Sequence, residues 1–414
     1  MANNTLTADV IAKIALPILE NELGCLRYMH RAHEDEFSST VNGYKVGDTI
    51  SIRRPADFTV RSGAVMSTQD VIEGKVALTI DQLKGIDFQF TSSDLTLKVE
   101  DMADRIIKPA MSNLVNLIAQ DVLSEMYKGT YNWVGTPGQI VNSFTDFAKA
   151  PQRLDELAAP QNDRAAVMNP TDFWGLVGSQ TALFAPNLVT SAYRTGELGN
   201  LGGLMTSMCQ VTPSHVVGVA TGTPLVNGAS QNVTYDTAKN TWTQSLITDG
   251  WTNSTTNILL RGDVFTIAGV YAVNPKTKAA LSHLQQFVVT ADASSGATTG
   301  PATLTISPPI IASGPHQTVS AAPADNAAIT VLGTGGTTYN QGLAFQKQAM
   351  ALAIVPMEMP AAAFGGTRKT YKDISIRLIP TYDAVNDISK WRLDVLYGRK
   401  LADPRVVTRF SGTP

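Results

Sequence analysis

The side chains best suited to chemistry in this 414-residue chain are its five histidines and two cysteines. His30 and His33 stand beside the acidic run 34–36, a set that could supply nitrogen and oxygen ligands to a metal ion. A histidine pair at a helix end next to acids is more often a solvated terminus, so we expect no metal site. Cys25 and Cys209 are too few for a disulfide framework or a thiolate metal cluster.

Motifs of nucleotide binding and covalent catalysis are incomplete. Residues 333–337 are glycine-rich but lack the Lys-Ser/Thr pair of a phosphate-binding loop, and no Gly-x-Ser-x-Gly elbow occurs. Arg261-Gly262-Asp263 resembles a cell-adhesion tripeptide, yet it precedes the alternating residues 264–267, which predicts a turn feeding a strand. We therefore expect no catalytic residue, no cofactor and no enzymatic activity.

The composition, 43% hydrophobic and 16% charged with a net charge of −3, indicates a globular protein of two or three domains. The small net charge gives no global attraction to nucleic acid or to an anionic membrane. The N-terminal residues lack a basic region, so we expect no secretory signal. The longest apolar stretch, 349–364, contains two prolines and is too short to span a bilayer.

Two elements near the N-terminus are predicted to need cover from another chain. Apolar residues at helical spacing predict an amphipathic helix over 8–31, kinked at Pro17. Alternating residues predict strands over 46–55 and 74–80, and the long polar connection between them predicts a projecting two-stranded arm over 45–80. Two strands alone are marginally stable in water, so this arm must lie on a neighbour.

Charged residues on these two elements are the candidate inter-subunit contacts. Their arginines could also touch phosphates, but no interleaved aromatics support a nucleic-acid groove, and we favour protein contacts. The candidates are Arg27, Arg31, Arg53, Arg54, Arg61, Asp70 and Glu73.

The rest of the chain mixes helices and strands. The longest helical pattern covers 97–127, with a main segment over 109–128 that has Pro109 in its first turn. Further helices are predicted at 144–158 and 171–178, a helical or irregular stretch at 344–356, and strands at 86–90, 374–379 and 391–398, the last two joined by a turn over 383–387. Residues 210–340 are poor in charge, and their short strands predict a small barrel or sandwich. Those strands are expected at 215–220, 232–235, 241–247, 257–260, 264–270, 287–291, 303–306 and 329–332.

Other function classes have weaker support. The Thr/Ser/Asn-rich β region, with Trp242 and Trp251 expected to be exposed, favours a carbohydrate-binding or adhesin-like surface protein as the alternative. A hydrolytic enzyme would need an Asp/His site for which no spacing is present.

The order of these elements resembles the major capsid (coat) protein of tailed double-stranded DNA bacteriophages, the Johnson fold, in the podovirus-type branch with an inserted telokin-like β-barrel. Four stretches are similar to that branch: 31–37, 46–55, 104–111 and 167–173. The resemblance implies an α+β fold divided into an N-terminal arm (1–40), an extended loop (41–84), a peripheral domain with a spine helix (85–133 and 370–406), an axial domain (134–215 and 341–369), an inserted β-barrel (216–340) and a C-terminal tail (407–414).

The resemblance also implies a function. Copies of the chain would self-assemble, through a procapsid, into hexamers and pentamers of an icosahedral phage head. The implied partners are a scaffolding protein, a portal protein at one vertex and packaged double-stranded DNA held by non-specific contact; a decoration protein is a further candidate, and no membrane is involved. The protein would be assembled in the host bacterial cytoplasm and belong to the virion.

Overall fold

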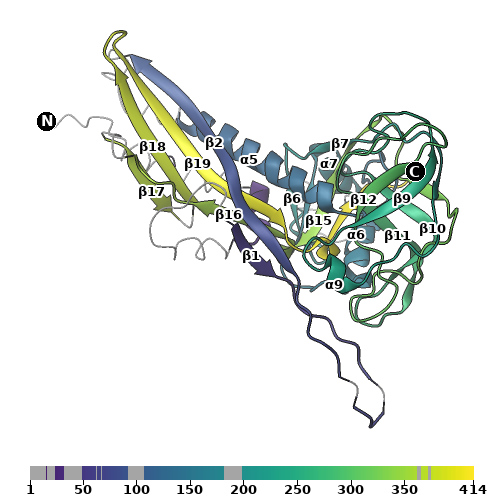
Figure 1. Ribbon diagram of the computed structural model, residues 1–414. Coiled ribbons are helices and arrows are strands. Elements are labelled where there is room, and N and C mark those ends of the chain that lie inside the picture. The colour runs from purple at the N-terminus through teal and green to yellow at the C-terminus, as the bar shows by residue number, and fades with distance from the viewer. Residues whose placement is uncertain are drawn as a thin grey trace. The chain divides into compact units, whose positions relative to one another are not determined.

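A computed structural model describes residues 15, 24–31, 49–61, 63–66, 68–91, 107–180, 198–360, 365–371 and 374–414 (Figure 1). The chain divides into two compact units, each built from separate stretches of sequence. The first comprises Met1–Ser51, Ala77–Val122 and Met350–Lys400, and the second comprises Ile52–Val76, Leu123–Ala349 and Leu401–Pro414. The division predicted from the sequence is finer than these two units and stays a prediction.

The first unit is built around a sheet of order β1-β2-β19-β18-β17, in which β16 also pairs with β19. Its strands are β1 (Thr49–Arg53), β2 (Lys75–Thr91), β16 (Met350–Val355), β17 (Thr367–Tyr371), β18 (Ile374–Asp383) and β19 (Ile388–Leu401). The predicted strands at 74–80, 374–379 and 391–398 are confirmed, as is the described part of the strand predicted at 46–55, whose residues 46–48 lie outside the described residues. Their polar and apolar residues alternate in the sequence, as the two faces of a strand require.

Strand β2 corrects one prediction, because 74–80 and 86–90 belong to a single strand of 17 residues. It pairs antiparallel with β19 from Gly398↔Ile80 to Ile388↔Thr91. A Cβ at Gly85 would lie 2.6 Å from the carbonyl oxygen of Leu393 and 2.7 Å from Oδ1 of Asp394. Gly85 therefore marks a close approach of two paired strands.

Helix α5 (Lys108–Gly129) confirms the predicted main segment over 109–128, with Pro109 in the first turn. Its 22 residues span about 33 Å. In the first unit Asp121 fixes it to β19, since Oδ2 accepts a hydrogen bond of 2.7 Å from Tyr397 and Oδ1 lies 2.8 Å from Nη2 of Arg399. Residues 97–106 lie outside the described residues.

The predicted N-terminal helix over 8–31 lies mostly outside the described residues, but its predicted end at residue 31 is wrong. Gly24–Tyr28 form a 3-10 helix, η1, and His30 makes a parallel bridge with Ala351 of β16. The chain has therefore left the helical path before residue 31.

A second sheet, in the second unit, has the order β3-β20-β15-β4-β6-β5. Its strands are β3 (Trp133–Val134), β4 (Arg164–Met168), β5 (Asn200–Leu201), β6 (Leu204–Met208), β15 (Gly342–Gln346) and β20 (Val407–Phe410). The predicted helices at 144–158 and 171–178 are confirmed as α6 (Phe144–Glu156) and α7 (Pro170–Gln180). Phe147 of α6 packs edge-on against Phe410 at 5.9 Å, which joins helix and sheet in one core.

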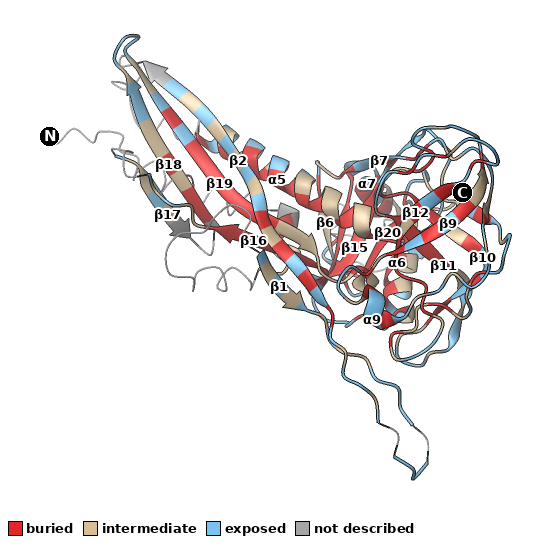
Figure 2. Cartoon of the chain, in the orientation of Figure 1, coloured by how far each residue is buried: buried red, intermediate tan, exposed pale blue. Residues whose placement is uncertain are grey.

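The prediction that 344–356 is helical or irregular is wrong. This stretch contains strands β15 and β16, separated by a 3-10 turn at Lys347–Ala349. Every residue of both strands is buried (Figure 2). A strand buried on both faces has no alternation, so its apolar run cannot be told from a buried helix.

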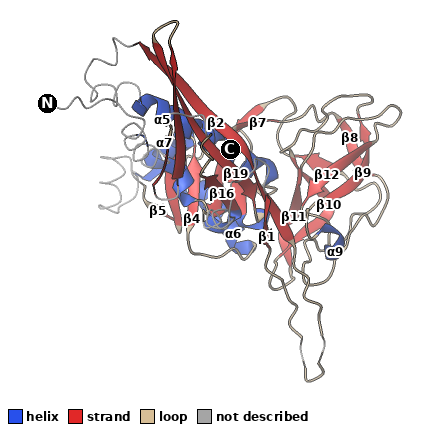
Figure 3. Cartoon of the chain, turned by 60° about the vertical axis from the view of Figure 1, so that its left-hand side comes forward, coloured by secondary structure: helices blue, strands red, loops and turns tan. Residues whose placement is uncertain are grey.

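The third sheet, also in the second unit, has the order β13-β10-β11-β12-β9-β8 (Figure 3). Its strands are β8 (Gly222–Val226), β9 (Gln244–Trp251), β10 (Val264–Val273), β11 (Ala280–Val289), β12 (Ala302–Ser307) and β13 (Ile329–Val331). Its two ends meet, because the Val226 amide donates to the Ala327 carbonyl at 3.0 Å and the Asn326 amide to the Val226 carbonyl at 2.9 Å. The sheet thus closes into a barrel around an apolar core.

Two strands predicted in this region do not form. Residues 232–235 lead into the short helix α9 (Tyr235–Ala238), and within 257–260 only an isolated bridge forms, between Leu259 and Ala293. Residues 215–220 contribute the short strand β7 (Ser214–Val216), which pairs with β14 (Thr338–Asn340) outside the barrel.

A buried arginine joins the barrel to the second sheet. Arg409 of β20 is fully buried, and its Nη2 donates to the carbonyl oxygens of Thr130 and Gly262, both at 2.8 Å. Its guanidinium lies 5.4 Å from the ring centroids of Tyr127 and Trp133. Burial lowers the pKa of Arg409 to about 9. This one side chain therefore holds three separate stretches of the second unit together.

Candidate functional site

A long loop, Arg54–Gly74, joins β1 to β2 and projects with most of its described residues exposed (Figures 1 and 2). Its large apolar side chains face solvent to an unusual degree. They are Phe58 (55% exposed), Val60 (96%), Val65 (85%), Met66 (78%) and Val71 (65%). A concentration of exposed apolar groups on one segment marks a surface that another molecule covers.

Side chains, and not a β ladder, hold the two branches of the loop together. At the base, the Arg54 amide donates to the Gly74 carbonyl at 2.8 Å. Further out, Oε1 of Gln69 accepts from the Thr59 amide at 2.9 Å, and Nε2 of Gln69 donates to the Thr59 carbonyl at 2.6 Å. Among the described residues of 55–73 no main-chain amide pairs with a main-chain carbonyl, so this backbone is open to other partners.

Aromatic and cationic side chains form an anchor at the base of the loop. The guanidinium groups of Arg54 and Arg405 lie over the ring of Trp242, at 5.3 and 5.7 Å from its centroid. Nε of Arg54 also donates to the Ala402 carbonyl at 3.2 Å. Gly74 lies so close to Lys239 that a Cβ would be 2.3 Å from its carbonyl oxygen. The loop base is thus packed into its own subunit.

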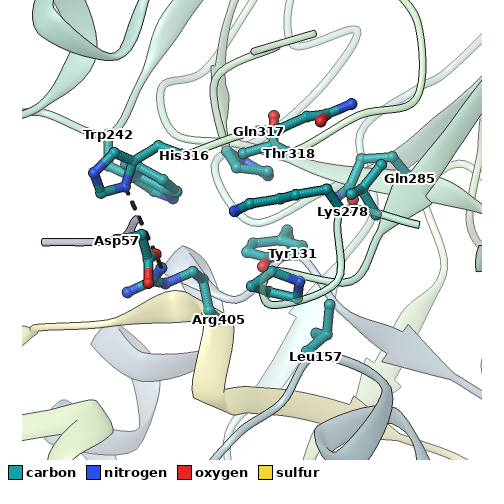
Figure 4. A pocket seen from close by; sticks show the side chains of 13 residues that line it. Asp57, Tyr131, Leu157, Trp242, Lys278, Gln285, His316, Gln317, Thr318 and Arg405 are labelled. Carbon is teal, nitrogen blue, oxygen red and sulfur yellow. Dashed lines mark hydrogen bonds and ion pairs between the residues drawn. The ribbon is translucent and has the colours of Figure 1, made fainter. Parts of the chain in front are cut away.

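Asp57 is the charged centre of this anchor (Figure 4). Its carboxylate lies 3.0 Å from Nη1 of Arg405, 3.1 Å from Nζ of Lys276 and 3.8 Å from Nδ1 of His316. Burial raises the pKa of Asp57, but the two cations more than offset this and hold it below its ordinary value. Arg405 also pairs with Asp403 at 2.9 Å, so Arg405 joins two carboxylates.

Replacing Asp57 by asparagine is expected to lower the free energy of unfolding by about 1–3 kcal/mol, because the largely buried Arg405 guanidinium would lose one of its two carboxylate partners. Urea denaturation of the unassembled chain measures this. Asp70→Asn, which removes an exposed carboxylate from the same loop, is the matched control and should change stability little. Equal effects of the two substitutions would contradict the anchor assignment.

Two histidines, His316 buried and His283 half-buried, predict a loss of stability in acid. Burial lowers the pKa of His283 and His316 to about 4 from an ordinary 6.5. In the unfolded chain both take up protons first, so their contribution is complete above pH 6.5 and is lost as the pH falls toward 4. Thermal unfolding should show a falling Tm over this window, and His283→Gln or His316→Gln should each reduce the fall. Wild-type acid sensitivity in both variants would refute this.

The predicted contact residues fall into three environments. Arg53 is exposed and pairs with Glu73 at 3.4 Å across the loop. Arg61 and Asp70 are exposed farther along it, while Arg27 is exposed on η1 and Arg31 half-buried just after it, in the first unit. Arg54 differs, because it packs against Trp242 of its own chain, and we assign it to the anchor. The anchor residues Asp57, Trp242, His316 and Arg405 were missed, since no local motif links them.

The tryptophans behind the carbohydrate-binding alternative are not exposed. Trp242 and Trp251 are only 4% and 2% exposed, so neither offers a face for a sugar ring. The turn predicted at Arg261-Gly262-Asp263 is confirmed, because the Asp263 carboxylate is buried and accepts from the Leu260 amide at 2.7 Å and the Gly218 amide at 3.0 Å. That aspartate is a structural group and is not available to a receptor.

The described residues contain no cluster of three or more His, Cys, Asp or Glu side chains that could hold a metal ion. No described helix has the length and apolar character needed to cross a membrane. A model of the family described as P22 coat protein, gene protein 5, matches residues 31–412. This chain belongs to the P22 coat protein family.

Similar proteins are themselves capsid proteins. This chain is 22% identical to the major capsid protein of Acyrthosiphon pisum secondary endosymbiont phage 1, over 430 residues that cover both chains completely. Among solved structures, that of Mycobacterium phage Che8 is 13% identical and covers 92% of this chain and 89% of its own, with a TM-score of 0.47. The CUS-3 coat protein I-domain is 31% identical but covers only 27% of this chain, and 96% of its own, with a TM-score of 0.19.

Membership of the P22 coat protein family fixes the general role. The chain is a phage major capsid protein with a mixed α/β fold, a structural component of the virion. It associates with copies of itself in the icosahedral shell.

Proposed function

We propose that this chain assembles into hexamers and pentamers of the phage head, with the loop Arg54–Gly74 of each subunit lying on a neighbouring copy. The observation that carries the proposal is the exposed apolar series of the loop, in which Val60 and Val65 are 96% and 85% exposed. One such contact is weak, but every subunit both gives and receives it, and a closed lattice makes the contacts cooperative.

The finer division of the chain follows from the same proposal. Residues 1–40 act as the N-terminal arm and 41–84 as the extended loop. Residues 85–133 with 370–406 form the peripheral domain, 134–215 with 341–369 the axial domain, and 216–340 the inserted barrel, with 407–414 as the tail. Arg27, Arg31, Arg53, Arg61, Asp70 and Glu73 are the proposed charged contacts between subunits.

The proposed partners follow from shell building. A scaffolding protein guides assembly in the host cytoplasm, a portal protein occupies one vertex, and double-stranded DNA fills the shell through non-specific contacts. The net charge of −3 supports weak and sequence-independent DNA contact only. The protein performs no enzymatic reaction in this role, and the buried state of Trp242 and Trp251 removes the main support for glycan binding.

Sedimentation of the full chain, expressed alone and with a scaffolding protein, tests the proposal. We expect megadalton particles that appear as closed shells in negative-stain micrographs. A monodisperse monomer or dimer under all assembly conditions would overturn it. A gel shift at about 150 mM salt should show no tight, saturable DNA binding by unassembled subunits, because few phosphate contacts survive screening at that salt concentration.

A further inference from the structure

A small cavity lies beside the anchor of the loop, inside the second unit (Figure 4). Its volume is about 20 Å³, enough for one water molecule or one monatomic ion. Its lining includes Asp57 of the loop, Arg405, and three residues of the segment that contains the barrel, Trp242, Lys278 and His316. The assembly role described above does not use this cavity.

Trp242 supplies the cavity with an N–H group that lacks an acceptor. Its side chain is 4% exposed, and its Nε1 has no hydrogen-bond partner in the described part of the chain. A buried donor left unpaired is destabilising. Trp251, which is equally buried, donates its Nε1 to Oγ1 of Thr248 at 2.9 Å. The contrast indicates that the Trp242 N–H is reserved for an acceptor that the chain itself does not provide.

Lys278 directs a positive charge into the same space. Figure 4 shows its side chain pointing toward Trp242 and His316. Its Nζ donates to the carbonyl oxygen of Pro315, and an ammonium group carries three N–H donors, so it has capacity for a further acceptor. Burial lowers the pKa of Lys278; Asp57 raises it, while Lys276 and Arg405 lower it further. Its positive charge is therefore incompletely balanced.

The charges around the cavity do not cancel. Lys278 and Arg405 line it and Arg54 lines the adjoining space, which gives three cations, while the exposed Lys276 pairs with Asp57 from outside. Asp57 and Asp403 are the two carboxylates among these lining groups. Both oxygens of Asp57 are already engaged, Oδ1 by Lys276 and Oδ2 by Arg405. His316 adds no charge near pH 7, since burial lowers its pKa to about 4.

The geometry points to a binding site for a monatomic anion of chloride size, held by the Trp242 N–H and the Lys278 ammonium. A hydrogen-bond acceptor that carries negative charge satisfies both donors and offsets part of the excess positive charge. The small volume of about 20 Å³ favours a monatomic anion over a larger oxyanion. The bound anion would stabilise the contact between the loop base and the segment that contains the barrel, and chloride would accordingly favour one position of the loop.

Nuclear magnetic resonance of the unassembled, full-length chain tests the site. With ¹⁵N in the tryptophan indoles, chloride is titrated against gluconate at constant ionic strength. The Trp242 N–H signal, assigned by its absence in Trp242→Phe, should shift saturably with chloride, and the Trp251 signal should stay in place. Lys278→Met should abolish the shift. A Trp242 signal that ignores chloride would show that the cavity holds no chloride. A saturable shift that survives Lys278→Met would show that the Lys278 ammonium does not hold the anion. Either result would overturn the site.

Thermal unfolding gives a second readout that needs no signal assignment. At equal ionic strength the Tm of the wild type should be higher in chloride or bromide than in gluconate. Trp242→Phe and Lys278→Met should lose this difference, and Trp251→Phe should keep it. The site is wrong if the three variants respond to chloride alike. Because neither readout involves shells, its failure would leave the proposed assembly role untouched.

Discussion

Replacing Val60, Val65 and Met66 together by serine is expected to abolish shell assembly while the subunit stays folded. These side chains are 96%, 85% and 78% exposed, so they contribute almost nothing to the fold of the free subunit. Buried on a neighbour, each would contribute about 1.5–3 kcal/mol, and the loss would recur at every subunit of the lattice.

Sedimentation and thermal unfolding of the same preparation measure the two halves of this prediction. The triple variant should sediment as small species and keep a wild-type Tm. Val385→Ser is the matched control, because Val385 is 92% exposed in the turn between β18 and β19, outside the loop. Normal shells from the triple variant would show that the loop does not make the contact that we propose.

Replacing Arg409 by methionine should destabilise the second unit by about 3–5 kcal/mol. The carbonyl oxygens of Thr130 and Gly262 would stay buried without their donor, and two aromatic rings would lose the cation above them. Arg409→Lys keeps the charge but not the planar fork that reaches both carbonyls, so it should recover only part of the loss.

Urea denaturation of unassembled chains is the measurement, with Arg392→Met as the control. Arg392 is 55% exposed and pairs at 2.9 Å with the buried Asp394, which keeps a second partner in Arg377 at 2.6 Å. Its loss should lower stability by less than about 1 kcal/mol. A similar midpoint for Arg409→Met and Arg392→Met would mean that the buried guanidinium does not hold the second unit together.

The sequence predicted those elements that have one buried and one exposed face. Strands β18 and β19 were recognised because their residues alternate, and α5 because its apolar residues recur at helical spacing. Strands β15 and β16 were not, because burial on both faces removes the alternation. Two separate strands were predicted at 74–80 and 86–90, yet the residues between them continue a single strand.

The site was only partly predictable for a different reason. A projecting arm over 45–80 follows from two alternating segments and a long polar connection, and the loop Arg54–Gly74 lies where the arm was expected. The anchor joins Asp57 to Arg405, which are 348 residues apart, so no local spacing could reveal it. Trp242 seemed exposed because its neighbours in the sequence are polar, but residues distant in the sequence bury it.

The distance along the sequence between Asp57 and Arg405 also affects how the newly made protein folds. A bacterial ribosome adds about 5–20 residues each second, so Arg405 follows Asp57 by roughly 20 to 70 s. Throughout that interval Asp57 lacks its Arg405 partner, and β20 is missing from the middle of its sheet. The anchor at the loop base therefore cannot be completed before translation has passed residue 405.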